Sequence, residues 1–132
     1  MRPGRSTRER GSVTLVTAAI LAVAVVITLG AVDVWRVVEA RSQAQIAADA
    51  AALAAAHDLA LGAVDPPASS AEMFAGYNGA TLVSCDCAPG GMEATVEVEL
   101  PVGRLALFPD DLSVDASARA TAGGDTVIPS AP

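Results

Sequence analysis

The sequence predicts an α+β protein with a long N-terminal transmembrane helix that continues into an extracytoplasmic stalk. A short helix and a small antiparallel three-stranded sheet follow. Three observations support this: 21 consecutive residues without a charge, 29 further residues with neither proline nor glycine, and two later segments in which apolar and polar residues alternate. With 132 residues, the chain has room for only one small domain outside the membrane.

Residues 12–32 form the uncharged stretch. Eleven are Val, Leu or Ile, five are Ala, and the rest are Ser, Thr or Gly. A helix of this length spans roughly 31 Å, close to the ~30 Å hydrocarbon core of a bilayer. Its branched aliphatic side chains favour insertion by roughly 3–7 kcal/mol in total. We expect a transmembrane helix surrounded by lipid, because a chain this small has little with which to cover such a helix in a soluble domain.

The charge distribution predicts the orientation of this helix. Four of the eight basic residues precede the apolar stretch, whereas residues 33–132 carry four Arg against fourteen acidic residues. The positive-inside rule therefore makes residues 1–11 a cytoplasmic basic tail and places the remainder outside the plasma membrane. The acidic outer part argues against a nucleic-acid partner.

A basic start followed by an apolar run also fits a secretory signal that is cleaved near Gly30 or Ala31. We favour a retained anchor, because the run is longer than the ~7–15 residues of a usual signal core. The helical pattern also continues through the region where cleavage would occur.

Residues 33–61 extend the helix beyond the membrane. Ala44–Ala56 is nearly all Ala, the best helix former, and Gly62 is suited to end the helix. Small side chains let helices approach closely. Five alanines at three- and four-residue spacing form a stripe along the stalk: Ala40, Ala44, Ala47, Ala51 and Ala54. We expect this stripe to pack against helices of other chains; the alternative is that Ala here only favours helix formation.

A linker, residues 62–69, separates the stalk from residues 70–122, the predicted small domain. Ser69-x-x-Glu72 has the spacing of a capping box and predicts a short helix from about Ser70 to Tyr77. Three large side chains share one face of that helix, and we expect the rest of the domain to pack on them: Met73, Phe74 and Tyr77.

Three strands are expected after this helix. Ala80–Cys87 contains enough apolar and β-branched residues to form the first strand. From Met92 to Leu100 apolar and polar residues alternate without an error, which predicts a strand with one buried and one solvated face. Its glutamates fit that solvated face better than a cation site.

Pro101 is expected to end the second strand. The secondary structure of residues 102–108 is ambiguous, and a short turn of helix is one option. Residues 112–121 alternate again and predict the third strand. Arg119 on this strand can lie across from a glutamate of the second. Residues 123–132 are expected to be a disordered tail.

Motifs for catalysis are few. The one histidine, His57, lies on the Ala-rich helix without a second His or a Cys nearby, whereas a metal site needs three or four ligands. The sequence shows no Ser-His-Asp pattern, phosphate-binding glycine loop or dinucleotide fingerprint. We therefore expect no enzyme activity, no metal, no cofactor and no small-molecule substrate.

Cys85 and Cys87 are the residues for which a chemical role, disulfide formation or exchange, is conceivable. Outside the membrane a disulfide can form, and residues two apart on a strand have Cα atoms within ~7 Å, so a strained bond between them is reachable. Strained disulfides exchange readily. The usual redox motif instead has two residues between its cysteines in a thioredoxin-type fold. We favour a structural or inter-chain disulfide, or free thiols, over catalysis.

Much of the sequence resembles a known family. R-G-S-V-T-L at Arg10–Leu15, the apolar run and the segment Asp33–Ala56 are similar to the TadE/TadG-like pilus-assembly proteins, especially the short actinobacterial members. The most specific part is R-x-x-x-Q-x-x-A-D-A-A-A-L-A-A-A, which begins at Arg41. The segment Asn78–Cys85 and the strand after it also resemble that subgroup.

This resemblance implies a pilin-like (pseudopilin), single-pass protein of a tight-adherence (Flp-type) pilus or a related secretion apparatus, without enzyme activity. Its partners would be other pilin-like or pilus-assembly membrane proteins, and the alanine stripe would pack against their helices. Two alternatives are an accessory subunit of another cell-envelope complex and an extracytoplasmic thiol–disulfide protein that uses Cys85 and Cys87.

Overall fold

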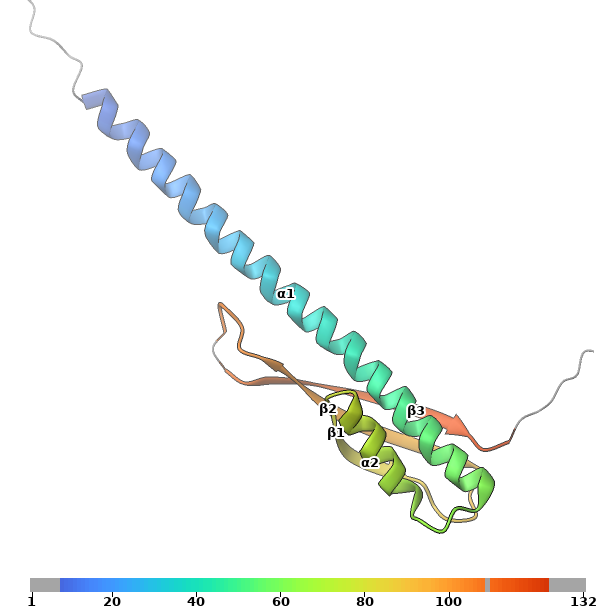
Figure 1. Cartoon of the computed structure of the whole chain (residues 1–132). Helices are drawn as coiled ribbons and strands as arrows, with labels where there is room; N and C mark the ends of the chain where they lie inside the picture. The colour runs from blue at the N-terminus through green and yellow to red at the C-terminus, as the bar shows by residue number, and fades with distance from the viewer. Residues whose placement is uncertain (1–7, 109, 124–132) are drawn as a thin grey trace, which may run out of the picture.

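A computed structural model describes residues 8–108 and 110–123. The predicted disordered tail 123–132 lies outside the described residues except for its first position, as does most of the basic tail 1–11. Along the chain, a 54-residue helix is followed by a short helix and three strands: α1 (Arg8–Leu61), α2 (Pro67–Tyr77), β1 (Thr81–Asp86), β2 (Glu93–Gly103) and β3 (Leu112–Thr121). The predicted α+β class is confirmed (Figure 1).

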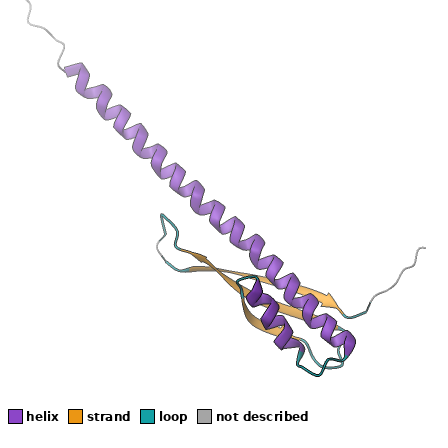
Figure 2. Cartoon of the chain, viewed as in Figure 1, coloured by secondary structure: helices purple, strands orange, loops and turns teal. Residues whose placement is uncertain are grey.

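Helix α1 runs without a break through the apolar stretch and the stalk (Figure 2). Within the described residues it is the one helix long and apolar enough to cross a membrane. Two hydroxyls of the apolar stretch are bonded inside the helix: Thr17 donates to the carbonyl of Val13 at 2.9 Å and Thr28 to that of Ala24 at 2.8 Å. Such bonds remove the cost of placing a hydroxyl in lipid.

The three strands form one antiparallel sheet in the order β1-β2-β3. β2 does not end at Pro101 as we expected but continues to Gly103. Pairing of β1 with β2 starts at Thr81 opposite Glu99, so β1 does not reach Pro101, and the β2–β3 register shifts between Pro101 and Gly103. A proline is tolerated there because strands accept it at free edges and bulges.

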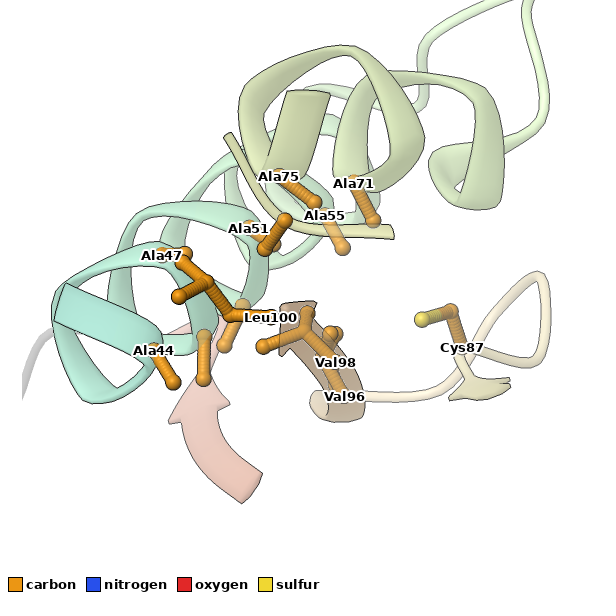
Figure 3. Close-up of a cluster of buried hydrophobic side chains, with 14 of the residues drawn as sticks. Ala44, Ala47, Ala51, Ala55, Ala71, Ala75, Cys87, Val96, Val98 and Leu100 are labelled. Carbon is orange, nitrogen blue, oxygen red and sulfur yellow. The ribbon is translucent and has the colours of Figure 1, made fainter. Parts of the chain in front are cut away.

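Both helices cover the same face of the sheet. α1 packs over β2 and β3, while α2 lies beside α1 and packs over β1 (Figure 1). The core between these layers consists of small side chains, mainly alanines of the two helices against Val96, Val98 and Leu100 of β2 (Figure 3). The polar residues of β2 lie on the opposite, solvated face, and Arg119 of β3 contacts Glu93 there at 2.9 Å.

Helix α2 differs from the prediction in its start and in its buried face. It begins at Pro67 rather than near Ser70, and no side chain caps it; proline suits a first helical turn because its φ is already helical. Ala71 and Ala75 are buried, whereas the three large side chains predicted to form the core are exposed: Met73, Phe74 and Tyr77. Against the alanines of α1, only small residues fit.

Candidate functional site

The loop that joins β2 to β3, of which residues 104–108 and 110–111 are described, lies beside α1 at the end of the apolar stretch (Figure 1). There Asp33 is only 4% exposed, and it is the one charged side chain buried within the described residues. Its two carboxylate oxygens accept hydrogen bonds from the backbone N–H groups of Ala106 at 2.7 Å and Leu107 at 2.8 Å. We call this arrangement the Asp33 clasp.

Two further contacts hold the loop on the helix. Arg36, one turn beyond Asp33, donates a hydrogen bond from Nη1 to the carbonyl of Arg104 at 2.8 Å. On the other side of the clasp the chain passes close to Gly30, where an added Cβ would lie 3.6 Å from Leu107 Cδ1. The loop therefore follows α1 for almost two turns, from the end of the apolar stretch to the start of the stalk.

The clasp changes the acidity of Asp33. The N–H group of Ala106, followed by that of Leu107, holds the pKa of this carboxyl below its usual value of 3.8; burial opposes the effect, and the Arg36 charge adds to it. Hydrogen bonds to the ionised form favour that form. Asp33 is therefore a carboxylate at neutral pH, and both of its oxygens are satisfied.

No sequence motif marks the Asp33 clasp, and the site was not predicted. The available signal was the position of Asp33. It is the first charged residue after the apolar stretch 12–32, and a lone carboxylate there needs a partner. Its partners are backbone N–H groups more than 70 residues away, and every non-proline residue carries such a group. No side-chain motif could have identified the loop.

The structure corrects our prediction for the alanine stripe. Ala40, Ala44, Ala47 and Ala51 are buried under the chain's own sheet and α2, while Ala54 is half-buried (Figure 3). The close approach that small side chains allow is used within the chain, between α1 and its own domain. The chain itself therefore covers four of the five alanines, and Ala54 stays partly open.

Cys85 and Cys87 lie at the end of β1, and the structure joins them in a disulfide with Cα atoms 5.4 Å apart. Cys85 is half-buried, and Cys87 is at the rim of the core (Figure 3). The disulfide closes a very small loop. Cys85 pairs with Val96 between β1 and β2, so the two side chains lie on the same face of the sheet.

Among residues 8–108 and 110–123, the remaining polar groups do not converge on a reaction centre. His57 is exposed on α1, with Nδ1 4.0 Å from the carboxylate of Asp58. No set of three or more potential metal-ligating side chains occurs in the part of the chain that the structure describes. Between α1 and α2 lies a shallow, mostly apolar groove of about 380 Å³, whose walls include Leu53, His57 and Phe74.

Comparison with known proteins found a family match that lies within α1. Residues 11–58 match the family model described as "Putative Flp pilus-assembly TadE/G-like". The matched segment contains the apolar stretch, Asp33 and the alanine stripe, and it ends before the short helix and the sheet. No curated protein and no solved structure matches the chain. The predicted resemblance is thus confirmed for the long helix, which is similar to the TadE/G-like pilus-assembly proteins.

Proposed function

We propose that this protein is a single-pass membrane protein that acts, without catalytic activity of its own, in assembly of an Flp-type pilus or a related secretion apparatus. The observation that carries the proposal is the match of residues 11–58 to the pilus-assembly family over the helix that is long and apolar enough to cross a membrane. The excess of Arg before the apolar stretch supports a cytoplasmic N-terminus and an extracytoplasmic domain.

The fold suits a component whose outer domain must keep a fixed position above the membrane. α1 is both the apolar helix and one layer of the domain core, so no flexible linker separates the two. The Asp33 clasp adds a second attachment at the point where the apolar stretch ends. In the proposed role, the domain is therefore presented to partner subunits in one orientation.

Partner contacts in the proposed role come mainly from surfaces other than the alanine stripe, because the chain itself covers four of the five alanines. The outer half of α1 still exposes the apolar side chains of Ile46 and Leu53 on its open side. In the proposed role, other pilin-like or pilus-assembly membrane proteins contact the lipid-embedded half of α1, this open side, or both.

The proposal can be tested by deleting the gene in its source bacterium and complementing it with the tagged full chain. We expect loss of surface pili, their recovery on complementation, and co-purification of pilus-assembly membrane proteins from detergent extracts. A photo-crosslinking residue at Leu53, with Glu97 on the solvated sheet face as a comparison position, identifies direct neighbours.

A matched pair of variants links function to membrane insertion. Val23→Arg with Ile27→Arg places two charges at the centre of the apolar stretch, at a cost of roughly 5–7 kcal/mol, which is as large as the roughly 3–7 kcal/mol gained from insertion. We expect this double variant to fail in complementation and Val23→Leu with Ile27→Leu to succeed. Unchanged pili after deletion would contradict the proposal, and co-purification of a different envelope complex alone would favour an accessory subunit of that complex.

A further inference from the structure

The loop between β2 and β3 reaches the depth of the apolar stretch. Leu107 Cδ1 lies within van der Waals distance of a Cβ built on Gly30, and Gly30 precedes the last residue of the stretch by two positions. At ~1.5 Å of rise per residue, this contact lies about 3 Å inside the end of the uncharged segment. If lipid surrounds that segment, it also surrounds the tip of this loop.

The loop is held at this depth. The Asp33 clasp fixes the backbone of Ala106 and Leu107, and Arg36 fixes the carbonyl of Arg104. These three hydrogen bonds satisfy polar backbone groups at the level of the membrane boundary, where an unpaired group would be costly. Three backbone groups of the loop are therefore paired where the loop approaches hydrocarbon.

The side chains at the tip are apolar and unburied. Leu107 is 41% exposed and Phe108 63% exposed, although both are large hydrophobic residues. Trp35, also exposed, lies on α1 next to the same boundary, and an indole favours the headgroup region. Arg36 and Arg104 stand on the outer side of the clasp, where guanidinium groups can meet lipid phosphates.

We propose that Leu107 and Phe108 insert into the outer leaflet of the bilayer and form a second membrane contact beside α1. The inference rests on the proposed membrane span of α1. Insertion is shallow, because the charges of Asp110 and Asp111 follow the tip and stay among the headgroups. Two points of attachment fix the rotation of α1 and the tilt of the outer domain relative to the membrane.

Tryptophan fluorescence in vesicles tests this proposal. The chain has one tryptophan, so Trp35→Phe gives a background into which Phe108→Trp is introduced. The full chain is reconstituted in phosphatidylcholine–phosphatidylglycerol vesicles with lipids brominated on the acyl chains. Two control probes in the same background are Val23→Trp, at the centre of the apolar stretch, and Tyr77→Trp, exposed on α2.

We expect the Phe108→Trp indole to emit at shorter wavelength and to be quenched by the brominated lipid, whereas Tyr77→Trp stays unquenched. Quenching of Val23→Trp without quenching of Phe108→Trp would overturn the inference and leave the membrane span intact. Absence of quenching from both would overturn the span and the inference together.

A second pair of variants tests the role of the clasp. Asp33→Asn keeps the shape of the side chain but lacks one of the two acceptor oxygens. We expect it to reduce quenching of the Phe108→Trp indole, while Glu39→Gln, an exposed acid on the same helix, leaves quenching unchanged. Equal quenching in all three backgrounds would show that the clasp does not hold the loop in the membrane.

Discussion

Asp33 Oδ2 accepts a hydrogen bond from the backbone N–H of Leu107 at 2.8 Å, although the two residues lie 74 positions apart. The bond joins the start of the stalk to the loop between β2 and β3. Together with the alanine core further along α1, it attaches the outer domain to the helix at two separate places. The domain is therefore fixed against rotation about α1.

Loss of the Asp33 carboxylate should release the loop without unfolding the domain. In Asp33→Asn, we expect the amide hydrogens of Ala106 and Leu107 to exchange roughly tenfold faster, the factor expected when a hydrogen bond to a charged group is lost. Exchange in the centre of β2 should not change, because the alanine core is intact. Hydrogen exchange followed by mass spectrometry in micelles measures both. Equal protection of the loop in Asp33→Asn and Glu39→Gln would contradict this.

The clasp should be sensitive to acid. Since the pKa of Asp33 is lowered from 3.8 in the folded chain, the folded carboxyl binds its proton less tightly than the unfolded one. The clasp therefore stabilises the fold fully above about pH 3.8 and loses this contribution as pH falls through the lowered pKa. The Arg36 charge, one turn further along α1, adds to the lowering of the Asp33 pKa. The carbon shift of the Asp33 carboxyl reports the midpoint, and a midpoint above 3.8 would contradict the assignment.

Enlarging the alanine stripe should destabilise the chain's own domain. Ala47 and Ala51 are fully buried, so Ala47→Leu and Ala51→Leu each overpack the interface between α1 and the sheet, by about 1–3 kcal/mol. Ala60→Leu, at an exposed position on the same helix, should cost about 0.5 kcal/mol or less. Chemical unfolding followed by circular dichroism compares them. Wild-type stability of the double Leu variant would mean that the stripe packs elsewhere.

Removal of the disulfide should have a small effect. Cys85 and Cys87 are two positions apart, and so short a loop restricts the unfolded chain by only roughly 1.5 kcal/mol on the loop-entropy estimate. We expect Cys85→Ser with Cys87→Ser to lower the free energy of unfolding by about this amount and to support pilus assembly normally. If the variant folds but fails in complementation, the alternative of a thiol–disulfide protein gains support.

Local patterns in the sequence predicted much of the fold. The alternation from Met92 to Leu100 required a strand with its glutamates in solvent, and β2 has this arrangement. The absence of Pro and Gly between Asp33 and Gly62 predicted that the helix continues beyond the apolar stretch, and α1 ends at Leu61. In both cases the signal lies in consecutive residues: the alternation for the strand and the missing helix breakers for the helix.

Relations between distant elements were harder to predict. The spacing of Ala47 and Ala51 showed that something approaches α1 closely, but it could not show whether that surface belongs to this chain or to another. The size of Phe74 suggested a core position, whereas the narrow gap above α1 admits only the small side chains of α2. The partners of Asp33 are backbone groups, which carry no sequence signature.

We expect residues 12–32 to stay in the bilayer as the base of one continuous helix. The most direct test is the intact mass and N-terminal sequence of the mature protein, recovered separately from the membrane and soluble fractions of its source bacterium. We predict a chain in the membrane fraction that retains the whole apolar stretch. A soluble protein that begins near Ala31 would contradict the account.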